Sequence, residues 1–149
     1  MRRLASIRYV IHHAGQARLY APLRVLVYSS DADIRMRVRL ALGRLPDNDA
    51  APLDFVETAT QPAVIHQMVS GGIDLAILDA EAAPSGGIGL AKQLKDELLQ
   101  YPPIVVLTAR PDDAWLAAWS GADAVMSRAL DPIVLRELVV PLLRSRIIR

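Results

Sequence analysis

Asp79, Thr108 and Arg128 each follow a short, mainly apolar run and could form one chemical site. Such runs are typical of buried parallel strands. In an open α/β sheet, the carboxyl ends of the strands meet at one crevice, where ligands bind and reactions occur. A carboxylate with a hydroxyl and a cation beside it can accept a phosphoryl group and balance its charge. We therefore expect a phosphoryl-receiving type of pocket around Asp79.

The first apolar run, 24–28, does not supply the carboxylates that a cation at this pocket would need. Ser29 and Ser30 follow it, and Asp31 comes next. Mg²⁺ binds through carboxylates, phosphate oxygens and retained waters. Asp31 could replace a serine only if the strand slipped by one residue, which would turn its side chains over. We expect no metal site and no cofactor.

The elements that must position these residues alternate between strands and helices. Asp31 is a plausible N-cap of the first helix, and Pro141, inside the last helix, is expected to kink or divide it. The sequence predicts strands at 24–28, 53–58, 74–79, 104–108 and 123–127, and helices at 31–45, 62–69, 88–99, 112–120 and from Pro132 to about Arg146. This pattern predicts an α/β fold, a doubly wound five-stranded parallel sheet with strand order 2-1-3-4-5.

Composition limits the class of protein. The 149 residues suffice for one domain, and 52% hydrophobic with 22% charged residues suits a soluble globular protein. No uncharged apolar stretch approaches the length of a membrane span, so we expect no direct membrane insertion and a cytoplasmic location. The absence of cysteine excludes thiolate metal sites and cysteine nucleophiles. A net charge of +1 gives no support to a nucleic-acid partner.

Arginines concentrate in the first part of the chain. Residues 1–22 form an Arg-rich extension, and residues 23–149 are expected to form the folded domain. Two interpretations of the arginines remain open: solvated surface charge, or a surface that meets an acidic protein or a phosphate group. The candidates for partner contacts in the extension are Arg2, Arg3, Arg8, Tyr9 and Arg18.

The order of these motifs resembles the receiver domain of response regulators over about residues 23–145, with a flavodoxin/CheY-like fold. Asp79 stands at the family's phospho-accepting position. Gly87-Ile88 matches the Gly-apolar pair that follows it, and Thr108 matches the hydroxyl residue that ends strand four. Gly121-Ala122-Asp123 matches the segment before strand five, and Arg128 takes the place of the usual lysine.

The departures from the family concern switching. Ser29-Ser30 stands where the family has two acidic residues that hold Mg²⁺, and Arg128 is a planar guanidinium in place of a compact ammonium. Ala129 replaces a proline, and Val125 replaces an aromatic residue that changes rotamer on phosphorylation. The resemblance with these changes implies an atypical, non-enzymatic receiver. For Asp79 itself we favour a carboxylate paired with Arg128 in a surface crevice over the family's phospho-acceptor.

A finer resemblance concerns the partner. The segments 72–79, 91–98 and 108–115 resemble the response-regulator-like accessory subunits of bacterial respiratory complex I. This resemblance implies a large protein complex as partner, the cytoplasmic arm of that enzyme, and a location at the inner face of the plasma membrane through it. The alternative is a single-domain response regulator phosphorylated on Asp79 by a sensor histidine kinase.

Trp115 and Trp119 lie four residues apart and would share one face of a helix. Aromatic residues at this spacing are often part of the core. Exposed tryptophans would instead be strong anchors for a partner. The sequence leaves both interpretations open.

Overall fold

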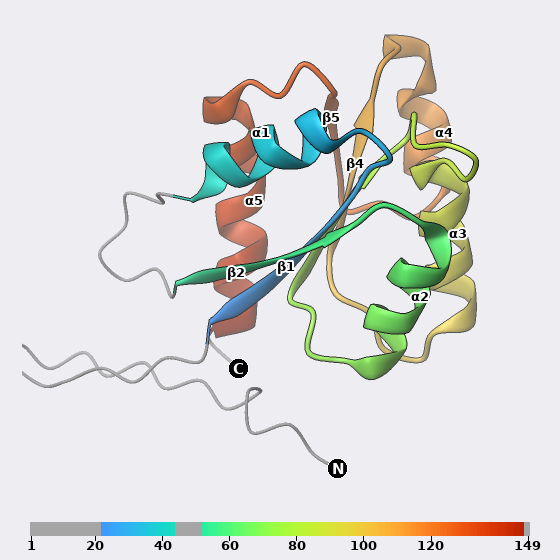
Figure 1. Cartoon of the computed structure of the whole chain (residues 1–149). Coiled ribbons are helices and arrows are strands. Elements are labelled where there is room, and N and C mark those ends of the chain that lie inside the picture. Colours follow the sequence, from blue (N-terminus) through green and yellow to red (C-terminus); the bar gives the residue numbers. More distant parts are fainter. Residues whose placement is uncertain (1–21, 44–51, 148–149) are drawn as a thin grey trace, which may run out of the picture.

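The computed structural model describes residues 22–43 and 52–147, which form a five-stranded parallel sheet with helices on both faces (Figure 1). The strand order is β2-β1-β3-β4-β5, as the sequence predicts. In chain order the elements are β1 (Leu23–Tyr28), α1 (Ala32–Leu42), β2 (Leu53–Thr58), α2 (Gln61–Ser70), β3 (Leu75–Asp79), α3 (Gly87–Glu97), β4 (Ile104–Thr108), a 3₁₀ turn (Pro111–Asp113), α4 (Ala114–Trp119), β5 (Ala124–Ser127) and α5 (Pro132–Ile147).

The sheet separates two hydrophobic cores. α1 and α5 cover one face, and α2, α3 and α4 cover the other (Figure 1). Because neighbouring strand residues point to opposite faces, Val25 and Val27 of β1 pack beneath α1 and α5, whereas Leu26 and Tyr28 pack beneath α2 and α3. Burial on both faces explains why the central strands read as continuous apolar runs.

Local signals set the helix ends. The Asp31 carboxylate accepts a hydrogen bond from the Asp33 N–H and caps α1, as predicted. The helix expected over 31–45 spans Ala32–Leu42, and the Gly43 N–H makes its last helical bond, to the Arg39 carbonyl. The helix expected over 112–120 begins as the 3₁₀ turn and becomes α-helical at Ala114.

α5 runs through Pro141 as one helix, so of the two expected effects, a kink or a division, the division is wrong. A proline inside a helix removes one backbone hydrogen bond. Leu135, Val139 and Leu143 are almost fully buried in the core beneath α5, on both sides of Pro141. Their packing keeps both halves of the helix against the sheet.

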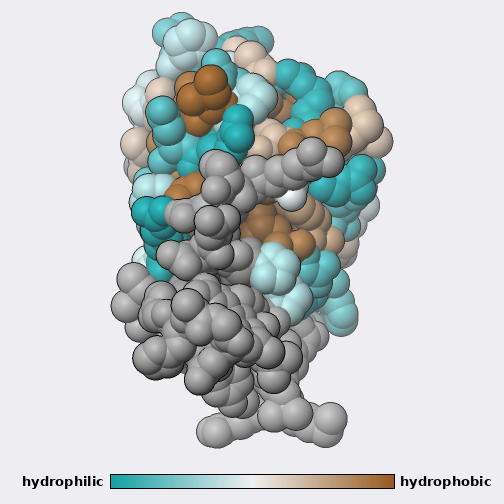
Figure 2. All heavy atoms as spheres, turned by 90° about the vertical axis from the view of Figure 1, so that its left-hand side faces the viewer, coloured by the Kyte–Doolittle hydropathy of each residue, from teal (hydrophilic) through white to brown (hydrophobic). Residues whose placement is uncertain are grey.

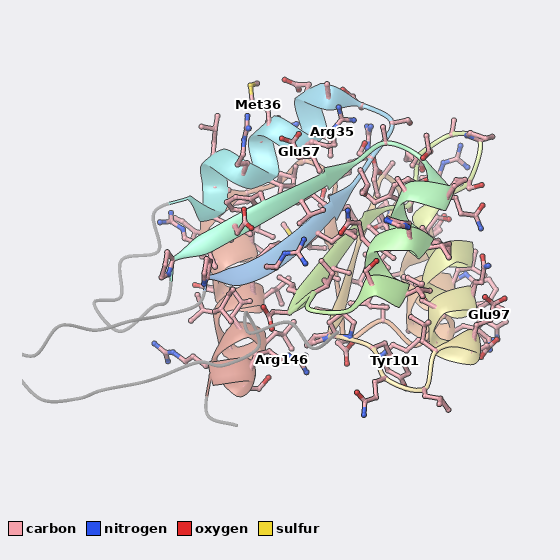
Figure 3. All side chains as sticks on the ribbon, turned by 60° about the horizontal axis from the view of Figure 1, so that its bottom comes forward. Arg35, Met36, Glu57, Glu97, Tyr101 and Arg146 are labelled. Atoms are coloured by element: carbon pink, nitrogen blue, oxygen red, sulfur yellow. The ribbon has the colours of Figure 1, made fainter. Side chains whose placement is uncertain are left out.

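The arginines of α1 bind neighbouring parts of the domain. Arg35 and Arg39 contact the Glu57 carboxylate of the edge strand β2 at 3.3 and 3.2 Å, and Figure 3 shows Arg35 close to Glu57. Arg37 donates a hydrogen bond to the Ala129 carbonyl. These guanidinium groups therefore fasten α1 to β2 and to the loop after β5, which neither interpretation of the arginines anticipated.

Where described residues are in view in Figure 2, the side of the molecule that carries α1 and the β2 edge shows separate apolar patches among hydrophilic side chains. Met36 and Leu40 of α1 are among the exposed apolar residues. Within residues 22–43 and 52–147, no helix is both long and apolar enough to cross a membrane.

Candidate functional site

Asp79 ends β3, the central strand, and its side chain is fully buried. β1 and β4 flank β3, with Tyr28 opposite Leu78 and Leu107 opposite Asp79. The pairing of Asp79 with Arg128 is present, as expected. The expected location of Asp79 in a surface crevice is wrong, because the surrounding loops and the Arg128 side chain cover the carboxylate.

Both oxygens of the Asp79 carboxylate accept hydrogen bonds from the protein. The Ser29 hydroxyl donates to Oδ2 at 2.7 Å, and the Glu81 backbone N–H donates to Oδ1 at 3.0 Å. The Nε of Arg128 lies 3.0 Å from Oδ1 and 3.2 Å from Oδ2. A buried carboxylate is tolerated only when it is paired and hydrogen-bonded, and here it is both.

Arg128 follows β5 and reaches two acidic groups at once. Its backbone N–H bonds the Thr108 carbonyl, which fixes the residue at the carboxyl end of the sheet. Its Nη2 lies 3.5 Å from Oδ2 of Asp31, while its Nε holds Asp79. The guanidinium therefore links the end of β3 to the start of α1.

The two serines after β1 have different roles. Ser29 is fully buried, and its hydroxyl donates to Asp79 and accepts from the Asp31 N–H at 3.0 Å. Ser30 is exposed, and its hydroxyl accepts from the Ala83 N–H at 3.0 Å. Ser29 belongs to the Asp79 site, whereas Ser30 ties two loops together beside it.

Asp31 does not move into the strand to replace a missing carboxylate. β1 pairs with β3 in register, with Val27 opposite Ile77, and Asp31 remains the cap of α1. Its carboxylate contributes to the site only through the contact with Arg128.

Thr108 lies at the expected strand end, and its hydroxyl is directed away from Asp79. It donates to the Met126 carbonyl of β5 at 3.4 Å, so it satisfies a backbone group in the neighbouring strand. Val125 of β5 is half-buried against the core under α3.

Sequence reasoning missed three groups around the site: the Glu81 N–H, the Arg35 guanidinium and the Tyr28 phenol. The Glu81 N–H contact is an Asx turn, which the position two residues after Asp79 could have indicated. Arg35 donates through Nη1 to the Ser29 carbonyl at 2.6 Å. Tyr28 donates to the Ser85 carbonyl at 2.5 Å, and burial, with the nearby charge of Asp79, raises the pKa of this phenol.

Gly87 sets how closely α3 approaches the site. A Cβ at this position would lie 2.8 Å from the Asp79 carbonyl oxygen and 2.9 Å from the Leu78 carbonyl carbon. Only a glycine permits this contact between the helix and β3.

The donor set does not fit Mg²⁺, the ion that the family resemblance implies. Asp79 is the one buried carboxylate at this strand edge among the described residues, and Ser29, Glu81 and Arg128 already bind its oxygens. Within the same residues there is no group of three His, Cys, Asp or Glu side chains placed to hold a metal. Ser29 and Ser30 bring no charge to offset that of a cation.

The second set of candidate residues lies away from this pocket. Trp115 and Trp119 are 68% and 60% exposed, so the interpretation of these residues as core is wrong. Ala117, on the other side of α4, is the buried residue of this short helix. Nζ of Lys92 lies 5.6 Å from the centre of the Trp119 ring. Arg2, Arg3, Arg8, Tyr9 and Arg18 lie outside the described residues.

No protein-family model matches the chain. Two uncharacterized response regulatory proteins of Mycobacterium tuberculosis, from different strains, are each 58% identical to it over 123 residues, which cover 83% of this chain and 92% of each relative.

Solved structures show the same fold at low sequence identity. A two-component response regulator from Clostridium difficile is 19% identical, with a TM-score of 0.68 over 82% of this chain and 96% of that chain. The response regulator TrrA from Thermotoga maritima, in complex with Mg²⁺ and BeF, is 23% identical, with a TM-score of 0.68 over 80% and 98% of the two chains. The fold, the central Asp79 and the identity to the mycobacterial relatives lead to one conclusion: the chain belongs to the response-regulator family and contains its receiver domain.

Proposed function

We propose that this protein is a receiver that does not switch and that acts, without enzymatic activity, as a protein-interaction module. One observation carries the proposal: Arg128 and Ser29 occupy the carboxylate oxygens of Asp79, which would have to attack a phosphoryl donor.

The physical argument concerns the nucleophile. A carboxylate that accepts a phosphoryl group must present a free oxygen and must have a cation to neutralise the incoming charge. The Arg128 guanidinium binds the Asp79 carboxylate where that cation would be needed, and Asp31 holds Arg128 in turn. Phosphorylation would have to break charge-assisted hydrogen bonds in a buried site, where they are strongest.

The proposed contact surface is the exposed face of α4. Trp115 and Trp119 are amphipathic and rigid, and residues of this kind dominate the binding energy of protein interfaces. Lys92 adds a cation beside Trp119. Lys92 is itself paired with Asp96 at 2.6 Å, so the complementary partner is one with an apolar patch.

We further propose that the partner is the cytoplasmic arm of bacterial respiratory complex I, which would place the protein at the inner face of the plasma membrane. The support is the resemblance of segments 72–79, 91–98 and 108–115 to the accessory subunits of that enzyme. The Arg-rich extension, residues 1–22, offers a second contact region for the same partner.

The alternative is phosphorylation of Asp79 by a sensor histidine kinase, which family membership favours. Incubation of the full chain with Mg²⁺ and a small phosphodonor, read by intact mass, tests it. We expect no added phosphoryl mass. A phosphoryl adduct that appears in the wild type and is absent from Asp79→Asn would overturn the proposal and establish the switch.

Purification of the tagged chain from native cells in mild detergent, read by mass spectrometry, tests the partner. We expect complex I subunits in a fixed ratio, retained with Asp79→Asn and lost when Trp115 and Trp119 are both replaced by serine. Recovery of a sensor kinase, or of the chain alone, would contradict the assignment.

A further inference from the structure

A groove lies at the opposite end of the sheet from Asp79, where the strands begin. It encloses about 390 Å³ between the loop before β3, the loop before β4 and the last turn of α5. Ile73, Pro102 and Met68 form its apolar part, and Arg146 closes one side. Figure 3, with this end turned forward, shows Tyr101 and Arg146 on it.

Two exposed side chains with large apolar parts, Leu99 and Tyr101, line the groove. The Leu99 side chain is fully exposed. Tyr101 is 41% exposed, with Lys95 over its ring at 4.3 Å. A cluster of exposed apolar side chains around a concave surface indicates a contact site rather than scattered surface residues.

The N-terminal part of the chain enters the domain beside this groove. The described chain begins at Pro22, and β1 begins at Leu23. The Arg24 N–H donates to Oδ2 of Asp74 at 2.8 Å, and the same carboxylate lies 3.7 Å from Nε of Arg146, which lines the groove. A single carboxylate therefore separates the start of β1 from the groove wall.

We propose that residues 17–21 dock in this groove, with Leu19 and Tyr20 covering its apolar rim. An extended chain spans about 3.3 Å per residue, so five residues reach about 17 Å, enough to cross a surface of this size. The segment is apolar except for Arg18, whose charged end can stay in water while its apolar neighbours cover the groove.

The outer part of the extension has a different chemistry. It contains Arg2, Arg3 and Arg8, and Arg146 at the end of α5 lines the groove. Repulsion between like charges disfavours docking of the outer part there. The inference thus goes beyond the proposed function: it assigns the inner segment to the domain itself and leaves the outer arginines for a partner.

A disulfide test is direct because the chain contains no cysteine. Leu19→Cys combined with Leu99→Cys places one thiol on the segment and one on the groove rim. Leu19→Cys combined with Leu40→Cys is the matched control, since Leu40 is an equally apolar, 71% exposed residue on α1, on the opposite face of the sheet. Tethering alone gives both pairs an effective concentration in about the millimolar range.

In the dilute full chain, we expect the Leu99 pair to form an intramolecular disulfide at least about tenfold faster than the Leu40 pair, because docking adds to the effect of the tether. Equal rates for the two pairs would overturn the proposal. Disulfide-linked dimers of the Leu99 pair would overturn it too, because they would assign the groove to a second copy. Hydrogen exchange gives an independent readout: Tyr20→Ser should speed exchange in the loop over 98–103, and Tyr9→Ser should not.

Discussion

The Nε of Arg128 lies between the two carboxylate oxygens of Asp79, 3.0 Å from Oδ1 and 3.2 Å from Oδ2. The guanidinium still extends to Asp31, 3.5 Å from its Nη2. An ammonium is a point charge without this planar arrangement of donors, so a lysine could not hold both acidic groups in the same way. Arg128 therefore acts as a fixed link between β3, β5 and the start of α1.

Removing this link should destabilise the domain, because Arg128→Ala leaves the Asp79 charge buried with only the Ser29 and Glu81 donors. We expect the free energy of unfolding to fall by about 3 kcal/mol for Arg128→Ala, and by about 1 kcal/mol for Arg128→Lys, which keeps the charge. Urea denaturation measures both. Arg136→Ala is the control, since Arg136 donates to the Pro132 carbonyl of its own helix, away from Asp79, and it should change stability by less than about 0.5 kcal/mol. Equal losses for the alanine and lysine variants would contradict the role of the charge.

Restoring the missing carboxylates should create a cation site. In the variant with Ser29→Asp, Ser30→Asp and Arg128→Lys, Asp79 gains acidic neighbours and loses the guanidinium. For a site with a dissociation constant of about 0.1 mM, we expect Mg²⁺ at about 10 mM to raise its stability by about 2–3 kcal/mol. Thermal denaturation with and without Mg²⁺ measures the effect.

The control for this experiment keeps Ser29 and carries only Ser30→Asp and Arg128→Lys. This control should gain less stability from Mg²⁺, because Ser29 is the residue that contacts Asp79 directly. A wild-type protein that gains as much stability from Mg²⁺ would show that the existing donors already form a site.

Gly87 and Gly89 form a matched pair within α3. A Cβ on Gly87 would collide with the backbone of β3 at 2.8 Å, whereas nothing lies within 4 Å of a Cβ on Gly89. We expect Gly87→Ala to lower the free energy of unfolding by about 1–3 kcal/mol through overpacking. Gly89→Ala should raise it by up to about 1 kcal/mol, because alanine is the better helix former. Chemical denaturation of the two variants compares them, and a stabilising Gly87→Ala would refute the close approach of α3.

Tyr28 gives a pH dependence with a definite sign. Burial, and then the charge of Asp79, raise the pKa of Tyr28 above the ordinary 10.0, so the folded state favours the protonated phenol. Its contribution to stability is complete below pH 10 and is lost as the pH rises through the folded-state pKa. Between pH 10 and the folded-state pKa, we expect the free energy of unfolding to fall less steeply in Tyr28→Phe than in the wild type. Denaturation of the wild type and Tyr28→Phe across alkaline pH measures this slope, and equal slopes would contradict the preference of the folded state for the protonated phenol.

Much of the fold follows from the sequence for a simple physical reason. The central strands are buried on both faces, so Leu75–Asp79 and Ile104–Thr108 appear as apolar runs whose ends can be located. Parallel strands joined by helices place those ends at one edge, and this brings Asp79 and Arg128 together as predicted. Helix ends were less accurate, because apolar spacing shows which face is buried and does not mark the last helical residue; α1 ends at Leu42 and not at Leu45.

Tertiary structure alone decided which side chains enter the site and which face outward. Strand alternation predicts the direction of a side chain only while the strand continues, and Ser29 and Ser30 lie just beyond Tyr28, the end of β1. On α4, the spacing of Trp115 and Trp119 places them on one face, but only the packing of Ala117 against the sheet shows that this face is exposed. The sequence by itself determined the sheet, its strand order and the position of Asp79. The structure decided that arginine and serine hydrogen bonds occupy that carboxylate, because these contacts join residues about fifty positions apart.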